Sequence, residues 1–316
     1  MNERVLVAGC GAIGSVVACL LAEAGLEVDV LGRGEHLRAI ARPVVGGIEV
    51  DGIWGRHRAV PKNAFDDPGA AGFGYDCVLV ACKSFQTEAL VSALGPGRLA
   101  RHGHAISLQN GLGNVERLAA VFGAERSLAA RVIFGGEITQ PGRVRVTVEA
   151  EPLLIGHPSG GRDPGAERWA AVLDAAGVSC HATEDIVAAM WGKVFYNAAL
   201  NPLGALLGFN YGRLAEDEQL RRVMDRVIDE AYAVARAEQV LLRWQSAAEY
   251  RGHFYGKLLP PTVEHRSSML QDLERGRPTE IDAICGEVVR RGDVHGIDVS
   301  ANRVLLALVK ARSGPA

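Results

Sequence analysis

The fold is decided by the stretch Arg4-Val5-Leu6-Val7-Ala8-Gly9-Cys10-Gly11-Ala12-Ile13-Gly14, in which a short apolar strand runs directly into a glycine-rich loop. Residues 15–22 follow as an apolar helix that ends at Gly25, and residues 27–31 read as a second strand. This is the pattern G-x-G-x-x-G, whose glycines permit a tight turn, let the backbone approach a pyrophosphate and pack the helix on the strand. The stretch therefore predicts a Rossmann domain that binds a dinucleotide through Gly9, Cys10, Gly11, Ala12, Ile13 and Gly14.

The end of the second strand indicates which dinucleotide binds. Enzymes that use NAD usually place Asp or Glu there to bind the ribose 2′-hydroxyl. Here the strand ends in Leu31-Gly32-Arg33, and Asp29 lies inside it. A guanidinium matches the geometry of a phosphate, so Arg33 favours the 2′-phosphate of NADP. The alternative is an arginine that is simply exposed on the surface.

Two later apolar strands end in polar residues. Residues 75–82 precede Lys83, and residues 104–108 precede Gln109-Asn110-Gly111. Ligands of open parallel sheets bind beyond the carboxyl ends of the strands, so Lys83 and Asn110 are candidate contacts of cofactor or substrate. A surface lysine and a turn asparagine are the alternatives. We expect residues 61–74 to form a loop, and the β-rich segments 127–134, 143–148 and 153–155 to extend the far edge of the sheet.

Residues 190–201 are expected to form the helix that carries the chemistry. Lys193, Asn197 and Asn201 are spaced i, i+4 and i+8, which stacks them on one face. Their neighbours are apolar, so this face is buried, where an amine and two amides need partners. A solvated stripe would carry Glu, Lys and Arg rather than two asparagines of poor helix propensity. The pattern predicts a proton donor flanked by two amides that hold a small polar substrate.

The length and the pattern of the chain indicate two domains. Its 316 residues suffice for two cores, and the pattern from residue 184 onward is almost entirely helical. We expect an α/β Rossmann domain with a mostly parallel, doubly wound sheet at residues 1–183, followed by an all-α domain for substrate binding and dimerisation at residues 184–316.

Composition narrows the class of protein. The net charge is −3 and no long basic run is present, which gives no electrostatic case for nucleic acid or a membrane surface. The six cysteines include no C-x-x-C pair, so we expect reduced thiols and no metal site. The N-terminus lacks the layout of a signal peptide, and we expect a cytoplasmic protein.

In this order along the chain, these stretches resemble the ketopantoate reductase family (2-dehydropantoate 2-reductase). The resemblance covers nearly the whole chain, and its combination of pieces is specific although each piece alone is weak. The pieces are Gly9–Gly14, Lys83-Ser84-Phe85-Gln86-Thr87, Leu108-Gln109-Asn110-Gly111, Trp191-Gly192-Lys193 with Asn197 and Asn201-Pro202-Leu203, Ser267-Ser268-Met269-Leu270-Gln271-Asp272, and Thr279-Glu280-Ile281-Asp282.

The resemblance implies NADPH and a 2-keto acid bound in a cleft between the two domains. It places the general acid on Lys193 and the substrate contacts on Lys193, Asn197, Asn201, Asn210 and Ser268. It places the cofactor contacts on the glycine loop and on Arg33, Lys83, Asn110 and Glu280. The chain departs from the family pattern between Asn201 and Asn210, where it looks one residue short, and at residues 297–302, which lack the usual Thr-Pro.

Local chemistry offers a plainer explanation for some of these residues. Asn210 by itself is a better helix cap than a ligand. Thr279 with Asp282 loosely fits a capping box, and Glu280 in a first helical turn favours the helix dipole. The hydroxyl of Ser268 could bond its own helix backbone.

The implied reaction is reduction of a 2-keto acid by NADPH. The first candidate is ketopantoate, whose reduction to pantoate serves pantothenate and coenzyme A biosynthesis. Two alternatives stay open: a paralogous NADP-dependent 2-hydroxyacid dehydrogenase with another substrate, and a non-catalytic NADP-binding regulator. The lysine and its paired amides argue against the regulator, because a sensor needs no proton donor. A homodimer, if one forms, would use the helical domain.

Overall fold

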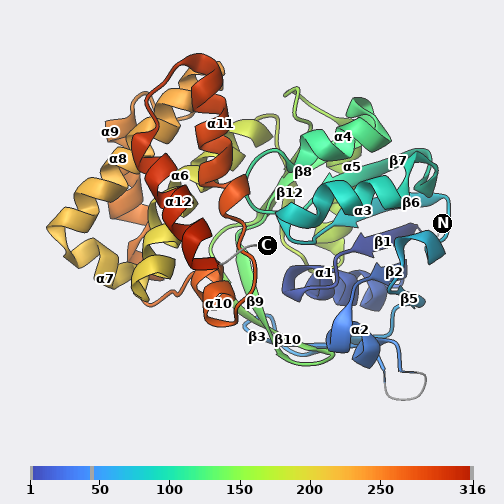
Figure 1. Cartoon of the computed structure of the whole chain (residues 1–316). Coiled ribbons are helices and arrows are strands. Elements are labelled where there is room, and N and C mark those ends of the chain that lie inside the picture. The colour runs from blue at the N-terminus through green and yellow to red at the C-terminus, as the bar shows by residue number, and fades with distance from the viewer. Residues whose placement is uncertain (1–2, 43–45, 314–316) are drawn as a thin grey trace. The chain divides into compact units, whose positions relative to one another are not determined.

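The computed structural model describes residues 3–42 and 46–313 (Figure 1). The chain forms two compact units: Met1–Gln109 with Asn114–Ile186, and Asn110–Gly113 with Val187–Ala316. We call them the α/β unit and the helical unit. The boundary expected from the sequence follows residue 183, whereas the units divide after Ile186. The short segment Asn110–Gly113 belongs to the helical unit although its neighbours in sequence do not.

An eight-stranded sheet runs through the α/β unit in the order β12-β11-β8-β7-β6-β1-β2-β5. Its strands are β1 (Arg4–Ala8), β2 (Glu27–Leu31), β5 (Asn63–Phe65), β6 (Tyr75–Val80), β7 (Leu99–Ser107), β8 (Ser127–Arg131), β11 (Leu153–Gly156) and β12 (Cys180–Ala182). All neighbouring pairs are parallel except β8 with β11. This confirms the mostly parallel sheet expected from the sequence.

Successive residues of the central strands pack into two different cores. In β1, Val5 and Val7 belong to one hydrophobic cluster, whereas Leu6 and Ala8 belong to the other. Both faces are covered because side chains alternate across a strand and helices lie on each side of the sheet. The helices of the first core are α1 (Ala12–Glu23), α2 (Gly34–Ile40) and α5 (Pro164–Ala175), and those of the second are α3 (Thr87–Leu94) and α4 (Asn114–Phe122). The sheet is therefore doubly wound.

A second, four-stranded sheet in the order β4-β3-β10-β9 also packs against α1. Its strands are β3 (Ile48–Gly52), β4 (His57–Ala59), β9 (Phe134–Gln140) and β10 (Arg143–Glu149). Helix α1 contacts strands of both sheets, and its residues from Gly14 to Leu21 are all buried. This position explains why the helix is apolar on every side.

Two expectations about the strands were wrong. Residues 143–148 do not extend the main sheet, because β10 pairs with β3 and β9. The alternation of exposed arginine and buried valine over residues 143–146 is typical of a sheet with one solvated face and could have shown this. Residues 61–74 are not only a loop, because they contain the edge strand β5. Three residues are too few to show a periodic pattern.

The order of the strands reverses between β1 and β6. The chain begins at β1, adds β2 and β5 on one side, and then places β6 on the other side of β1. In open α/β sheets, ligands bind outside the carboxyl ends of the strands at such a switch point. Gly9 follows β1 there, and Cys82 and Lys83 lie just beyond β6.

The helical unit is built around α6 (Ile186–Leu207), which is buried along most of its length. Its other helices are α7 (Tyr211–Glu216), α8 (Glu218–Ala237), α9 (Ala247–His253), α10 (Ser268–Glu274), α11 (Cys285–His295) and α12 (Ser300–Ser313), drawn from yellow to red in Figure 1. This confirms the helical second domain. Within residues 3–42 and 46–313, no helix combines the length and the apolarity that a membrane crossing requires.

Aromatic side chains hold α6 in place. The rings of Phe195 and Tyr250 meet edge to face with their centroids 5.0 Å apart, and Trp244 packs on Tyr250 at 4.6 Å. The Tyr250 hydroxyl donates to the carbonyl oxygen of Gly192 at 2.8 Å. Such pairs contribute beyond their buried area, so the helix that carries Lys193 has a rigid support.

Candidate active site

The three glycines of the loop between β1 and α1 meet different constraints. Gly9 has a φ of +119°, and a Cβ there would lie 2.2 Å from the amide nitrogen of Cys82. A Cβ on Gly14 would lie 2.0 Å from the carbonyl oxygen of Gly9. A Cβ on Gly11, at the N-cap of α1, would have no described heavy atom within 4 Å. Two glycines therefore serve close packing, and the third leaves the start of α1 open, as a pyrophosphate site requires.

The acid inside β2 and the arginine after it lie in different environments. Asp29 is buried and its carboxylate accepts hydrogen bonds from the Tyr75 hydroxyl at 2.7 Å and the Asn63 amide at 2.8 Å. It is thus committed inside the sheet. Arg33 is exposed at the N-cap of α2 (Gly34–Ile40), and no described residue forms a hydrogen bond or ion pair with its guanidinium. Lys83 is half-buried and precedes the 3₁₀ turn η2 (Ser84–Gln86).

A chain of hydrogen bonds that sequence reasoning missed lies behind the glycine loop. The amide of Gly142 donates to Nδ1 of His36 at 3.1 Å, so the neutral ring carries its proton on Nε2. Nε2 is 2.9 Å from the Ser15 hydroxyl, which is 3.2 Å from Cys10 Sγ. Burial lowers the pKa of His36, and burial raises the pKa of Cys10 to about 11. The thiol is therefore a packed neutral group rather than a nucleophile.

The structure brings Lys193 and Asn110 together within the helical unit. Nζ of Lys193 donates to Oδ1 of Asn110 at 2.6 Å, although the two residues are 83 positions apart. The backbone next to Asn110 is held close to η7 (Ile281–Ala283): the amide of Leu112 donates to the carbonyl of Ala283 at 2.8 Å. A Cβ on Gly111 would lie 2.2 Å from that carbonyl oxygen. Only glycine permits this approach beside Asn110.

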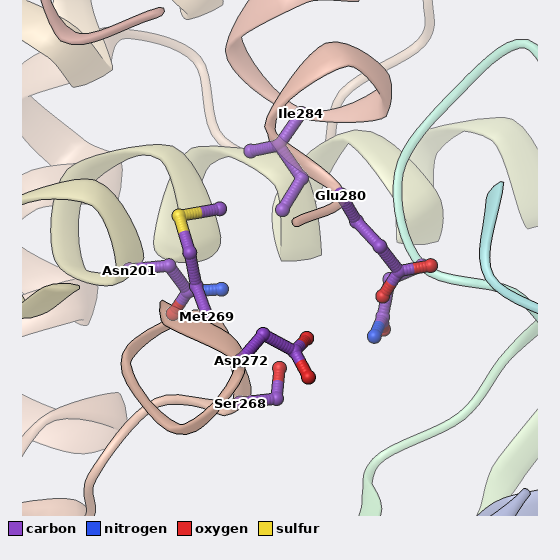
Figure 2. A pocket seen from close by; sticks show the side chains of 7 residues that line it. Asn201, Ser268, Met269, Asp272, Glu280 and Ile284 are labelled. Carbon is purple, nitrogen blue, oxygen red and sulfur yellow. The ribbon is translucent and has the colours of Figure 1, made fainter. Parts of the chain in front are cut away.

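The amides on α6 are buried as expected. Asn197 is 7% exposed and Asn201 is 6% exposed, whereas Lys193 is half-buried. The hydroxyl of Tyr211 donates to Oδ1 of Asn201 at 2.7 Å. This bond fixes the orientation of the Asn201 amide, and Figure 2 shows its nitrogen turned toward the pocket.

A small polar pocket in the helical unit collects four of the residues singled out from the sequence. Its lining consists of Asn110, Asn201, Ser268, Met269, Asp272, Glu280 and Ile284 (Figure 2). Ser268 and Asp272 enter it from α10, and Glu280 from the segment just before η7. The cavity has a volume of about 10 Å³, room for roughly one water molecule. Among the described residues, Lys193, Asn197 and Asn210 do not line this pocket.

Asp272 is a pocket residue to which the sequence had assigned no role. Its side chain is 3% exposed and pairs with Arg277 at 2.7 Å. It lies four positions after Ser268, which places both on one face of α10. That spacing is the signal that could have identified it.

The capping residues differ in part from those expected. Ser267 caps α10 by accepting from the Leu270 amide at 3.1 Å, so Ser268 is left to line the pocket. The capping box of Thr279 and Asp282 does not form, because Glu280 takes the N-cap position of η7 without a capping bond.

Asn210 is a helix cap, as its local chemistry indicated. Its Oδ1 accepts from the amide of Arg213 at 2.9 Å and so caps α7. Its side-chain nitrogen lies 3.3 Å from a carboxylate oxygen of Glu264, beside a different surface pocket. The structure does not bring Asn210 to the polar pocket, and its role toward a substrate stays a prediction.

Comparison with known proteins identifies the family. Residues 5–160 match the family model of ketopantoate reductase PanE/ApbA, and residues 185–313 match the model of its C-terminal part. The 2-dehydropantoate 2-reductase of Aquifex aeolicus is 36% identical over 313 residues, which are 99% of this chain and 97% of that protein. The enzyme of the same name from Archaeoglobus fulgidus is 33% identical, over 98% of this chain and 97% of its own length.

Solved structures also resemble this chain along nearly its whole length. The PanE/ApbA family ketopantoate reductase of Ralstonia eutropha is 35% identical, with 98% of each chain covered and a TM-score of 0.85. D-mandelate dehydrogenase in its ternary structure with NADH and anilino(oxo)acetate has a TM-score of 0.87 over 98% of each chain, and at 22% identity it shows a shared fold alone. The chain therefore belongs to the ketopantoate reductase family, and with it to the oxidoreductases that act on CH–OH groups.

Proposed function

We propose that this chain reduces ketopantoate to pantoate with NADPH, as the reductive step of pantothenate biosynthesis. The observation that carries the proposal is the 2.6 Å hydrogen bond between Lys193 Nζ and Asn110 Oδ1, one of whose partners lines the polar pocket. Two relatives that this chain matches over 97% of their length are named 2-dehydropantoate 2-reductase, and these names support the same substrate.

Lys193 is the proposed general acid. Reduction of a 2-keto acid builds negative charge on the keto oxygen, which an ammonium stabilises and then protonates. Asn110 accepts one proton of the ammonium, and this bond fixes the direction in which the amine points. The nicotinamide, when bound, supplies the hydride. The chain contributes the placement of the proton donor and the charge around it.

The polar pocket fits a hydroxyl at the far end of the substrate. Asn201 presents a donor, because its oxygen is occupied by Tyr211, while the carboxylates of Asp272 and Glu280 accept. A hydroxyl can satisfy both kinds of group, whereas the substrate's own carboxylate would lie against the two carboxylates of the pocket. The small volume of the pocket also suits a hydroxyl. Ketopantoate carries such a group on C4, and we propose that Asn197 and Ser268 hold the rest of the molecule.

The residues of the α/β unit fit a phosphorylated dinucleotide. The open start of α1 at Gly11 suits the pyrophosphate. Arg33 suits a 2′-phosphate, and Asp29, the acid nearest in sequence, is committed to Tyr75 and Asn63. We propose NADPH on these grounds, with Lys83, Asn110 and Glu280 as further contacts.

The test of the proton donor is Lys193→Ala. Loss of a general acid costs about 10²- to 10⁴-fold in kcat, and NADPH affinity should change little because Lys193 lies outside the glycine loop. The matched control is Lys257→Ala, which removes an exposed lysine of the same unit. The assay is steady-state oxidation of NADPH with a panel of 2-keto acids that includes ketopantoate. Unchanged kcat in Lys193→Ala would overturn the assignment, and a better substrate elsewhere in the panel would favour a paralogous dehydrogenase.

Arg33→Ser tests whether Arg33 recognises the 2′-phosphate of NADPH. Charge-assisted hydrogen bonds contribute about 1.5–3 kcal/mol, so KM for NADPH should rise about tenfold to a hundredfold while KM for NADH stays the same. Arg38→Ser, on the same helix, is the control. An equal loss with both cofactors would show that Arg33 does not recognise the 2′-phosphate.

A further inference from the structure

A cluster of buried polar side chains lies just beyond the ends of β6 and β7. Its members are Ser84, Thr87, Ser107, Gln109 and Asn114, each of which is 7% exposed or less. None of them has a part in the mechanism above. Burying this many polar groups is costly unless they are bonded to one another, so the cluster needs an explanation.

Gln109 and Thr87 form the centre of this cluster. The side-chain nitrogen of Gln109 donates to Oγ1 of Thr87 at 2.6 Å and to the Cys82 carbonyl at 2.9 Å. Thr87 lies 2.9 Å from the Ser84 carbonyl and 3.1 Å from Oδ1 of Asn114. A hydroxyl has a single proton, so Thr87 shares it between these two acceptors. One hydroxyl thus connects Gln109 with Asn114.

The two residues that Thr87 connects enclose a short loop. Gln109 and Asn114 belong to the α/β unit, and the four residues between them, Asn110–Gly113, belong to the helical unit. Gly111 and Gly113 have φ values of +82° and +81°, so the loop turns sharply twice. Thr87 therefore closes the base of a loop that begins with Asn110, the residue that accepts the hydrogen bond from Lys193.

We infer that Thr87 and Gln109 form a clip that positions Asn110 and, through it, the ammonium of Lys193. The inference rests on the proposed function of Lys193. Both residues act through Asn110 and are positioning residues rather than catalytic ones. A loop with two left-handed glycines is intrinsically free to move, and closing its base removes that freedom before the substrate binds.

The test compares Thr87→Val, which keeps the shape and removes the hydroxyl, with Thr87→Ser, which keeps the hydroxyl. Thr87→Val should lower kcat about tenfold to a hundredfold, because small misplacements of catalytic groups have effects of this size. Its KM for NADPH should stay within about twofold. Thr87→Ser should restore most of kcat. The control is Ser127→Ala, which removes another buried hydroxyl of the α/β unit, bonded to the Gly123 carbonyl at 2.9 Å.

Two further measurements separate positioning from general destabilisation. In an Asn110→Ala background, Thr87→Val should lower kcat little further, because residues that act as one unit are not additive. Backbone amides of residues 109–114 should exchange hydrogen faster in Thr87→Val, and in Gln109→Met if the first variant folds poorly, but not in Ser127→Ala. The inference is overturned if Thr87→Val matches Ser127→Ala in kcat and exchange, or if its effect adds fully to that of Asn110→Ala. Exchange tests the clip even if no keto acid is turned over, which would count only against the proposed function.

Discussion

The glycines of the loop between β1 and α1 differ in whether the structure has room for a methyl group. Gly11 has a φ of −82°, which any residue adopts, and open space where its Cβ would lie among the described residues. Gly14 has no such space, because a Cβ would meet the carbonyl oxygen of Gly9 at 2.0 Å. One glycine is therefore free of structural constraint and the other is not. Glycine at position 11 suits both the N-cap of α1 and the pyrophosphate site proposed above.

Gly11→Ala and Gly14→Ala should separate binding from stability. Gly11→Ala should change Tm little, because the stability gained by restricting the unfolded chain is offset by the weaker capping of α1 by alanine. It should weaken NADPH binding, because the methyl group occupies the approach to the backbone. Gly14→Ala should lower Tm by overpacking. Thermal melts and a fluorescence titration with NADPH measure the two effects. Wild-type affinity in Gly11→Ala would mean that the pyrophosphate does not approach there.

At the scale of elements, helix caps decide which polar side chains remain for ligands. On α10, Ser267 takes the capping role and Ser268 faces the pocket. On α7, Asn210 itself is the cap. Neighbouring serines with the same chemistry thus acquire different roles, because a cap needs extended backbone directly before the helix.

Asn210→Ala should lower stability by about 1 kcal/mol, the usual cost of losing an N-cap. Asn210→Ser, which can still cap, should recover most of it. Urea denaturation measures both. The KM for the keto acid decides whether Asn210 also binds substrate: a rise of similar size in both variants would restore Asn210 as a ligand, and no rise in Asn210→Ser would leave it a cap.

For the molecule as a whole, half-buried histidines link stability to pH. Burial lowers the pKa of His36, His104 and His265 below the ordinary value of 6.5. The unfolded chain therefore binds more protons than the folded chain as the pH falls below about 6.5. The stability from these neutral rings is fully present above that pH and is lost below it. In His57, hydrogen bonds to the Trp54 carbonyl and Glu23 outweigh burial and raise the pKa, which opposes the loss.

Acidification from pH 7.5 to pH 5.5 should consequently lower Tm, and His36→Gln should reduce the drop, because glutamine cannot take up a proton. His102→Gln, at an exposed histidine of the same unit, is the control. Thermal melts at the two pH values measure the difference. An identical drop in wild type and His36→Gln would show that the Gly142–His36–Ser15 chain tolerates protonation.

Much of the architecture could be predicted because it depends on local patterns. The strand at residues 4–8, the glycine loop and the helix after it follow from apolar runs and glycine spacing, and the doubly wound sheet and helical second domain agree with them. The stacking of Lys193, Asn197 and Asn201 follows from helical periodicity alone. The roles of these residues in binding and catalysis stay predictions for the experiments above.

The amino-acid sequence by itself determined the elements and the residue types available for chemistry, because hydrophobic period, glycine placement and caps act over a few neighbours. Only the tertiary structure decided that β10 joins the second sheet, that Asp272 enters the pocket and that Asn110 meets Lys193 across 83 positions. The physical reason is that strand pairing and side-chain contact between distant segments depend on how whole elements pack, and no local pattern records that packing.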